Sequence, residues 1–273
     1  MSTFQPIPLS PASSDDYIDE AGGFEERFFS ELAEIEAQSF WFRSRNRLII
    51  WALRSVGATS GKFLEVGCGT GFVLNGVAKA FPALKLTGSE LFPAALDYAK
   101  RRVPNAVFVA MDAKSSTTAG EYDYVGAFDV LEHIDDDQLA IKNLANALKR
   151  DGVFLVTVPQ HPWLWSRSDE YWRHCRRYRV GEAEAKLAEA GLIIVRSTSF
   201  VFTLLPILIT VRWLEKFKNA SFNPFKQLTL PQILSKIFEA LLWIEILAIS
   251  QGVNLPCGSS RLIIARKDSS QHA

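Results

Sequence analysis

The sequence predicts an α/β fold with a doubly wound sheet of seven strands. Short apolar runs suited to buried strands recur along the chain, segments with apolar residues at helical spacing separate most of them, and a glycine-rich turn follows the first strand. Strands separated by helices favour parallel pairing. The 273 residues suffice for one such domain with an elaboration.

The composition is that of a globular protein without an overall charge bias. Of the residues, 48% are hydrophobic and 22% charged, and 30 Lys and Arg balance 30 Asp and Glu. A neutral chain without a long basic stripe argues against a nucleic-acid partner. Cys68, Cys175 and Cys257 lie far apart and leave one unpaired in any disulfide scheme, which indicates a reducing, cytoplasmic compartment.

The N-terminal part is expected to hold a leader and then a helical segment. Residues 1–23 are rich in Pro, Ser and Asp and lack the basic and apolar regions of a signal peptide, so we expect a flexible leader. In residues 24–60 a helix is predicted from Phe24 to about Arg54. It carries Trp41 and Arg45 in an aromatic and cationic cluster. That cluster is either a core contact beside a solvated face or part of a lid over a ligand.

A glycine-rich loop follows the first predicted strand at 62–66 and precedes a predicted helix at 72–81. In Gly67-Cys68-Gly69-Thr70-Gly71 the alternate glycines let the main chain approach a ligand, and the helix start supplies unpaired N–H groups. A dinucleotide fingerprint requires G-x-G-x-x-G, but here the third glycine comes one residue early and Phe72 takes the last glycine's place. NAD is therefore disfavoured, and another nucleotide-like ligand is predicted.

The following segments alternate regularly between predicted strands and helices. Further strands are expected at 84–90, 106–113, 122–130, 152–159, 192–201 and 260–267, and further helices at 92–103, 135–149 and 182–190. Asp135 is expected to cap its helix, with Gln138 three residues on. Residues 61–201 would thus form a ligand-binding core, and 259–273 the last strand and a polar tail.

Acidic residues stand at the carboxyl ends of several predicted strands, where a parallel sheet binds its ligands. Glu90 ends the second strand about twenty residues after the glycines, where a carboxylate can accept hydrogen bonds from both ribose hydroxyls of a nucleoside. Asp112 ends the third strand and Asp129 the fourth. One such acid is usually a turn residue or a helix cap, but several in register with one glycine loop predict a nucleoside site.

The glycine loop with Glu65 before it, together with Asp129-Val130-Leu131-Glu132-His133, resembles the class I S-adenosylmethionine-dependent methyltransferases. The resemblance implies a Rossmann-like sheet with an antiparallel last pair of strands, S-adenosylmethionine as cofactor and S-adenosylhomocysteine as product. It also implies that Asp112 faces the adenine amino group. The expected cofactor-binding residues are Glu65, Gly67, Cys68, Gly69, Gly71, Phe72, Glu90, Leu91, Asp112, Ala113, Asp129 and Val130.

His133 allows two interpretations. The same segment also resembles the metal site of certain divalent-ion-dependent methyltransferases, with Asp129, Glu132 and His133 as ligands of Mg²⁺ or a similar ion. However, D-V-L-E-H is widespread in methyltransferases without a metal, so we expect none here. His133 would then bind the acceptor, act as a general base, or pack.

Two aromatic and basic stretches, 158–166 and 169–179, follow the fifth strand. They indicate an acceptor with an apolar or sugar face and an anionic group, the alternative being a solvated loop braced by buried tryptophans. Candidate bases are His133, His161 and His174, and candidate substrate-binding residues are Trp41, Arg45, Trp163, Trp165, Arg176, Arg177 and Tyr178. We expect His161 or His133 as the base and Arg176 with Arg177 as the anion-binding pair. The stretches resemble a bacterial subgroup associated with cell-envelope glycan or lipid pathways.

Residues 202–258 form an apolar insertion between the sixth and seventh strands. Pro206 in its first apolar run, and Glu239 and Glu245 in its second, make neither run a convincing membrane span. Its helices are expected to roof the acceptor site, to add core or a dimer interface, or to lie in a membrane interface. The cations expected to face anionic headgroups are Arg212, Lys216, Lys218 and Lys226.

These features predict a cytoplasmic O-methyltransferase, at the inner face of a membrane if the insertion binds lipid. Its acceptor would be an envelope glycan, a lipid-linked intermediate or a polyprenylated small molecule. The alternatives are a soluble small-molecule methyltransferase with an apolar lid and a non-catalytic cofactor-binding scaffold, although a scaffold needs neither the glycine loop nor Glu90. The sequence indicates neither the methylated atom nor the oligomeric state.

Overall fold

The computed structural model describes residues 27–115, 119–215 and 225–268. The expected leader at 1–23 lies outside them. Seven strands form one sheet in the order β3-β2-β1-β4-β5-β7-β6. They are β1 (Gly61–Val66), β2 (Leu84–Glu90), β3 (Val107–Ala110), β4 (Tyr122–Phe128), β5 (Leu148–Pro159), β6 (Leu192–Phe200) and β7 (Ser260–Lys267).

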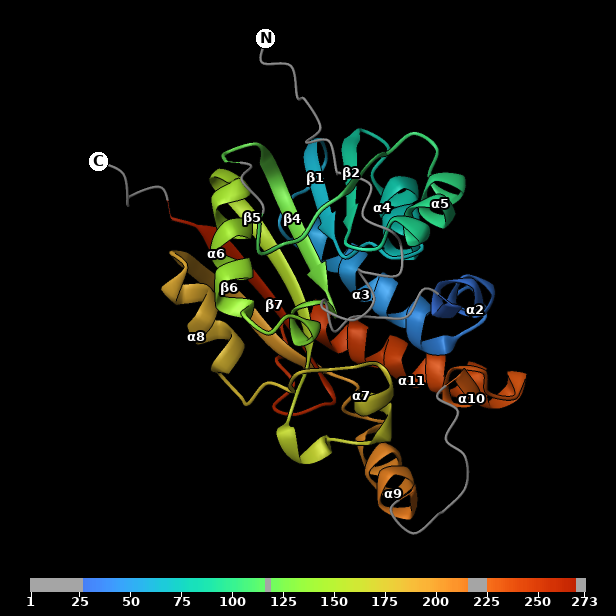
Figure 1. Ribbon diagram of the computed structural model, residues 1–273. Coiled ribbons are helices and arrows are strands. Elements are labelled where there is room, and N and C mark those ends of the chain that lie inside the picture. Colours follow the sequence, from blue (N-terminus) through green and yellow to red (C-terminus); the bar gives the residue numbers. More distant parts are fainter. Residues whose placement is uncertain (1–26, 116–118, 216–224, 269–273) are drawn as a thin grey trace.

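The pairing of the strands confirms the predicted doubly wound sheet. β1 to β5 are parallel to their neighbours, whereas β7 runs antiparallel between β5 and β6. Because β6 therefore runs in the same direction as β1, its carboxyl end lies at the same edge as the glycine loop. The chain that leaves β6 starts from this edge (Figure 1).

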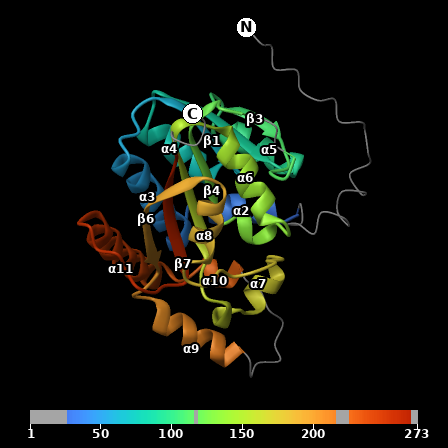
Figure 2. The ribbon, with the colours of Figure 1, turned by 90° about the vertical axis from the view of Figure 1, so that its left-hand side faces the viewer.

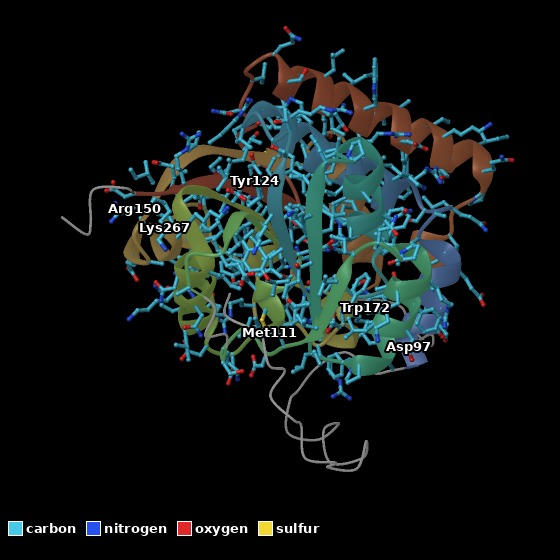
Figure 3. The ribbon with its side chains drawn as sticks, turned by 90° about the horizontal axis from the view of Figure 1, so that it is seen from above. Asp97, Met111, Tyr124, Arg150, Trp172 and Lys267 are labelled. Atoms are coloured by element: carbon cyan, nitrogen blue, oxygen red, sulfur yellow. The ribbon has the colours of Figure 1, made fainter. Side chains whose placement is uncertain are left out.

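Helices cover both faces of the sheet. They are α2 (Arg27–Ile35), α3 (Phe40–Ser55), α4 (Phe72–Ala80), α5 (Pro93–Arg102), α6 (Asp137–Ala147), α7 (Arg167–Tyr171), α8 (Glu182–Glu189), α9 (Leu205–Glu215), α10 (Phe225–Leu228) and α11 (Gln232–Ser250). Successive residues of β1 point to opposite faces of the sheet and belong to two hydrophobic cores. Phe63 lies in the core with α3, α4 and α11, and Leu64 lies in the core with α6 and α8. Figure 3 shows α11 and α6 on opposite sides of the molecule, with side chains filling the space between.

The structure corrects three predicted element boundaries. The single N-terminal helix is two helices, because Ser39 is extended and the chain turns between Ile35 and Phe40. The third strand ends at Ala110 rather than at 113. The helix predicted at 135–149 is α6, and residues from 148 on belong to β5. Its cap is Asp136 rather than the expected Asp135, because Asp136 accepts from the Leu139 N–H at 3.0 Å.

The insertion contains α9, α10 and α11, and one half-buried and one buried carboxylate connect it to the rest of the fold. Glu239 forms ion pairs with Arg43 and Arg47 of α3, each at 2.5 Å. Glu245 is buried and accepts hydrogen bonds from the Phe202 and Thr203 N–H groups at 3.1 and 2.7 Å. These acids therefore fix α11 against α3 and the end of β6. Among the described residues, no helix combines the length and apolar character needed to cross a membrane.

Candidate functional site

A cavity of about 580 Å³ lies at the carboxyl edge of the sheet. The glycine loop, the ends of β2 and β4, the turn between α2 and α3, and the insertion all line it. In Figures 1 and 2, α7 and α9 lie at the lower end of the molecule, on the side of this carboxyl edge. All twelve residues expected to bind the cofactor except Gly71 line this cavity. The predicted nucleoside site at the strand ends and the insertion therefore line the same cavity.

The glycine loop has a backbone that favours glycine at two positions, and at one of them it closely approaches a neighbour. Gly67 has φ +63°, and a Cβ there would lie 2.5 Å from Cγ2 of Val130. Gly69 has φ +50°, a conformation that favours glycine, although the space around it is open. The positive φ angles and the close approach to Val130 therefore both require glycine. Without side chains at these positions, the main chain of the loop is accessible from the cavity.

Glu90 holds the loop through its carboxylate. Its Oε2 accepts from the Gly69 N–H at 2.9 Å, and Oε1 accepts from the N–H groups of Leu91 and Phe92 at 2.8 and 3.3 Å. Burial raises the pKa of Glu90, and these three backbone hydrogen bonds oppose the rise. A carboxylate has about four acceptor positions, so Glu90 can also accept from ligand hydroxyls.

Glu65 presents an unsatisfied carboxylate oxygen in the cavity wall. The residue is 3% exposed, and its Oε2 has no hydrogen-bond partner within the described part of the chain. Burial raises the pKa of Glu65 well above its ordinary value, while the charge of Arg45 lowers it. A buried acceptor of this kind favours a ligand that brings a donor or a positive charge.

A second network joins the turn after α2 to the glycine loop. The Glu36 carboxylate accepts from Thr70 Oγ1 at 2.6 Å and from Arg102 Nη1 at 2.6 Å, and Glu36 also lines the cavity. Sequence analysis missed all three residues, because a glutamate at the end of a helix and an arginine in another carry no local signal. Only the tertiary fold brings α2 and α5 beside the loop.

The end of the third strand also reaches the cavity. Met111, Asp112 and Ala113 line it, but Asp112 stands two residues beyond β3, in a turn where its Oδ1 accepts from the Lys114 N–H at 2.8 Å. Figure 3 labels Met111 and Trp172, both of which line the cavity. Asp112 is thus placed for ligand contact by a turn that its own side chain supports.

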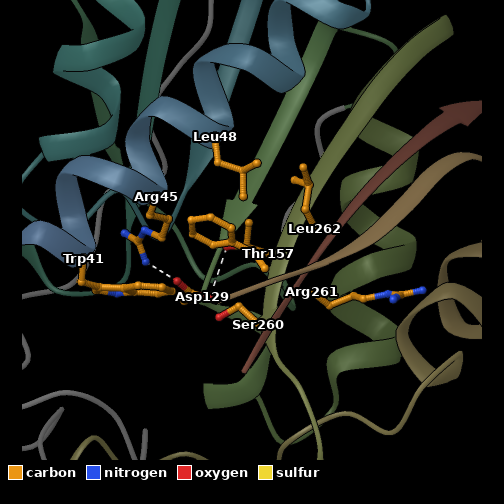
Figure 4. A pocket seen from close by; sticks show the side chains of 9 residues that line it. Trp41, Arg45, Leu48, Asp129, Thr157, Ser260, Arg261 and Leu262 are labelled. Atoms are coloured by element: carbon orange, nitrogen blue, oxygen red, sulfur yellow. Dashed lines mark hydrogen bonds and ion pairs between the residues drawn. The ribbon is translucent and has the colours of Figure 1, made fainter. Parts of the chain in front are cut away.

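Asp129 connects the sheet to the N-terminal helices. It has φ +56° directly after β4, its Oδ1 accepts from Thr157 Oγ1 at 3.2 Å, and its Oδ2 is paired with Arg45. Figure 4 shows this pair from close by, beside Trp41 and Ser260, in a crevice that shares these residues with the large cavity. Trp41 and Arg45 therefore do line the site, and Arg45 neutralises Asp129 there.

Glu132, His133 and His174 form a cluster in the cavity wall. One carboxylate oxygen and one nitrogen from each ring lie within 4.8 Å of one another, and the two rings meet edge to face with centroids 4.7 Å apart. Burial lowers the pKa of His133 to about 3, with the charge of His174 adding to the effect. Burial also raises the pKa of Glu132 well above its ordinary value. His133 is therefore a neutral imidazole at physiological pH.

The two arginines expected to bind an anion are engaged elsewhere. Arg177 is 8% exposed and donates from Nε to Asp169 at 2.7 Å, and although it borders the cavity its charge is compensated. Arg176 pairs with Asp137 at 2.6 Å and does not line the cavity. The two arginines therefore do not form the expected anion-binding pair, because each guanidinium is bound by a carboxylate of the protein itself.

Tyr178 is likewise a core residue rather than a substrate contact. It is 1% exposed, lies outside the cavity wall, and donates from its hydroxyl to Asp137 Oδ2 at 2.8 Å. Asp137 also accepts from Lys186 Nζ at 2.6 Å. Burial would raise the pKa of Asp137, but the hydrogen bonds from Lys186 and Tyr178 and the charge of Arg176 lower it below its ordinary range.

Asp137→Ala is expected to lower the free energy of unfolding by about 3 kcal/mol, because it leaves buried donors unpaired. Since the folded pKa is depressed, this contribution is complete above the unfolded value near 4 and is lost as the pH falls through the folded pKa. Urea unfolding at pH 7 and pH 3 should show a large difference from wild type that shrinks in acid. Asp97→Ala, whose side chain is 69% exposed, is the control and should change little.

His161, Trp163 and Trp165 do not line the cavity. His161 has φ +66° and stacks on Trp163, with centroids 5.1 Å apart, and the two tryptophans are 61% and 36% exposed. The loop after β5 turns these side chains away from the site, so the expectation that His161 is the base is corrected. Trp172, which was not singled out as a site residue, lines the cavity instead.

The insertion supplies an apolar wall opposite the strand ends. Its lining residues are Leu204, Ile207, Leu208, Val211, Arg212, Leu228, Leu230 and Phe238, and Val201, directly before the insertion, lines the cavity too. The one charged group among them, the Arg212 guanidinium, donates to the Leu164 carbonyl. The described part of the cavity is therefore polar on the sheet side and apolar on the insertion side.

Comparison with known proteins identifies the family. Residues 34–192, more than half of the chain, match the family model described as a methyltransferase domain, so the chain belongs to that family. The sequence resemblance to class I S-adenosylmethionine-dependent methyltransferases is thereby confirmed, and S-adenosylmethionine is the cofactor of this class.

Individual relatives are distant. A malonyl-[acyl-carrier protein] O-methyltransferase of Haemophilus ducreyi is 29% identical over 136 residues, covering 47% of this chain and 53% of that protein. A trans-aconitate 2-methyltransferase of Enterobacter sp. is 29% identical over 98 residues, covering 36% and 39%. The matches thus span about half or less of these curated relatives.

Solved structures confirm the fold. The phosphoethanolamine N-methyltransferase 2 of Haemonchus contortus, in complex with S-adenosyl-L-methionine, superposes with a TM-score of 0.62 at 18% identity, covering 97% of this chain and 62% of that one. A sarcosine dimethylglycine methyltransferase from Galdieria sulphuraria gives 0.55 at 15% identity, covering 83% and 86%. At these identities the likeness concerns the fold alone.

Proposed function

We propose that this protein transfers the methyl group of S-adenosylmethionine to an oxygen of an acceptor that has a large apolar part, such as a lipid-linked or polyprenylated compound. The observation that carries the proposal is the single cavity with two unlike walls, the glycine loop and strand ends on one side and the insertion on the other. The named O-methyltransferase relative supports oxygen as the methylated atom. None of the relatives named above acts on a glycan by its name, so we do not extend the proposal to glycans.

The cofactor fits the sheet side of the cavity. Glu90 would accept from the ribose hydroxyls while it holds the loop, and Asp112 would lie at the adenine end. The unpartnered oxygen of Glu65 would accept from the cofactor's ammonium group. When bound, S-adenosylmethionine supplies an already activated methyl group, so the chain's task is to orient the acceptor and exclude water.

Proton removal from an acceptor hydroxyl would fall to the histidines in the cavity wall. His133 is neutral and its Nδ1 has no hydrogen-bond partner. His174 is held by Asp169, whose Oδ1 lies 2.9 Å from its Nδ1, which leaves Nε2 as the nitrogen free to accept a proton. The apolar wall would hold the remainder of the acceptor away from solvent.

Methyl-labelled S-adenosylmethionine tests the proposal. The protein is incubated with a lysate of its own source, which is then separated into lipid, soluble and macromolecular fractions. We expect label in the lipid fraction, and strongly reduced label with Glu90→Ala. Label only in soluble small molecules would make the insertion a simple lid, and no label despite intact cofactor binding would support the scaffold alternative.

The outer surface of the insertion has exposed apolar side chains, which favour a membrane as the place where the enzyme binds such an acceptor. Trp243 and Ile244 of α11 are each 53% exposed, and further exposed apolar side chains lie on α9 and α11. We propose that this surface contacts a membrane. Among the cations expected to face it, Arg212 is engaged with Leu164, and Lys216, Lys218 and the side chain of Lys226 lie outside what the structure describes.

Flotation with vesicles that contain anionic phospholipid tests this contact. Wild type is expected to float, and a Trp243→Ser, Ile244→Ser double variant to lose most of its binding because it removes apolar area from the interface. Ile193→Ser with Val195→Ser is a matched control, since these β6 side chains are 55% and 53% exposed. Wild type that stays with the unbound protein would refute the proposal.

A further inference from the structure

The cluster of Glu132, His133 and His174 is built from two segments distant in sequence. Glu132 and His133 belong to the short turn after β4, and His174 follows α7. A backbone hydrogen bond from the Cys175 N–H to the Glu132 carbonyl, 2.7 Å long, holds the segments together. The potential ligand atoms of the three side chains lie within 4.8 Å of one another in the cavity wall.

Two of these side chains each have one buried atom without a hydrogen-bond partner among the described residues. Glu132 is 1% exposed and the atom is its Oε2, and in His133 it is Nδ1. An unsatisfied buried polar group destabilises the folded state. A cation between them would offset both costs, because a carboxylate and a neutral imidazole each donate a lone pair to it.

His174 is oriented as a metal ligand would be. Asp169 lies 2.9 Å from His174 Nδ1 and is itself fixed by Arg177 at 2.7 Å. An imidazole that donates Nδ1–H to a carboxylate presents the Nε2 lone pair on its other side, the arrangement that surrounds many metal-bound histidines. The structure thus provides one carboxylate oxygen and two imidazole nitrogens.

We propose that Glu132, His133 and His174 bind a divalent transition-metal ion. Two imidazoles with one carboxylate suit Zn²⁺, Mn²⁺, Fe²⁺ or Co²⁺ better than Mg²⁺ or Ca²⁺, which prefer oxygen ligands. Ligands about 2.1 Å from a tetrahedral ion lie about 3.4 Å apart, so the widest pair would have to close by up to roughly 1.4 Å when the ion binds. This set differs from the one the sequence suggested, because Asp129 is already paired with Arg45.

The three ligands leave coordination positions open toward the cavity. An acceptor oxygen bound there would be held in place by the ion, and the two histidines would then act as ligands rather than as bases. This consequence rests on the proposed function, but metal binding does not. Ion binding can be measured without methyl transfer, so a failure of the proposed metal site is distinguishable from a failure of the proposed activity.

Titration with Co²⁺ and Zn²⁺ tests the site. The protein, without a polyhistidine tag and freed of metal by a chelator, is followed by visible Co²⁺ absorption and by Zn²⁺ calorimetry. We expect one ion per chain, and at least about tenfold weaker affinity in His133→Ala, His174→Ala and Glu132→Gln. His161→Ala, outside the cavity wall, should bind as wild type does, and so should Cys175→Ser, which excludes the exposed thiol near His133.

The fold of each variant is checked by its binding of S-adenosylhomocysteine. Absence of a stoichiometric site in wild type would overturn the proposal. So would unchanged affinity in a His133→Ala, His174→Ala double variant that still binds S-adenosylhomocysteine, or loss of the ion in Cys175→Ser.

Discussion

Glu90→Ala is expected to weaken binding of S-adenosylhomocysteine by about 10- to 100-fold. The substitution removes the proposed acceptor for the ribose hydroxyls and leaves the N–H groups of Gly69, Leu91 and Phe92 without their partner. An unsatisfied buried group costs about 1–3 kcal/mol, which corresponds to this range of affinity. Isothermal titration calorimetry measures the change directly.

Glu121→Ala provides the matched control for Glu90→Ala. Glu121 is a carboxylate immediately before β4, at the opposite edge of the sheet, where it pairs with Lys62 at 2.9 Å. Its loss should leave cofactor affinity unchanged. Unchanged affinity in Glu90→Ala itself would move ribose recognition away from β2 and contradict the assigned site.

Gly67→Ala is expected to abolish measurable cofactor binding and to destabilise the fold. Its Cβ would meet Val130 at 2.5 Å, so the loop or the segment after β4 must move. The positive φ adds about 1–2 kcal/mol of backbone strain. Thermal unfolding and calorimetry with S-adenosylhomocysteine measure the two effects.

Gly120→Ala separates the strain from the clash. Gly120 has φ +61°, close to the +63° of Gly67, but an added Cβ there would have no atom within 4 Å. Gly120→Ala should therefore cost stability through the backbone alone and leave cofactor binding intact. Equal loss of binding in both variants would show that the contact with Val130 is irrelevant to the site.

The order of strands and helices could be predicted because each signal is local. Apolar runs, helical spacing and the glycine loop identified seven strands, and two of them, at 84–90 and 260–267, have the predicted bounds. The break after α2 could not be predicted, because nothing near Ser39 except the fold itself interrupts the helical pattern. At this break Glu36 pairs with Thr70 and Arg102, residues that are distant in the sequence.

The sheet side of the site could be predicted better than the acceptor side. Strand ends have a fixed relation to the glycine loop, so Glu65, Glu90 and Asp129 reach one cavity. The loop after β5 has no such constraint. Charge alone could not show that Arg176 forms an ion pair with Asp137, or that His161 lies outside the cavity wall. Whether a basic side chain binds a ligand or a neighbouring acid is decided by tertiary contacts.

A crystal structure with S-adenosylhomocysteine tests the central claim most directly. The account predicts the ligand in the cavity, with its ribose on Glu90, its adenine beside Asp112, and its sulfur facing the apolar wall of the insertion. The cavity would then retain space for an acceptor between the sulfur and His133. A ligand bound elsewhere, or one that fills the insertion side and leaves Glu90 without contact, would contradict the account.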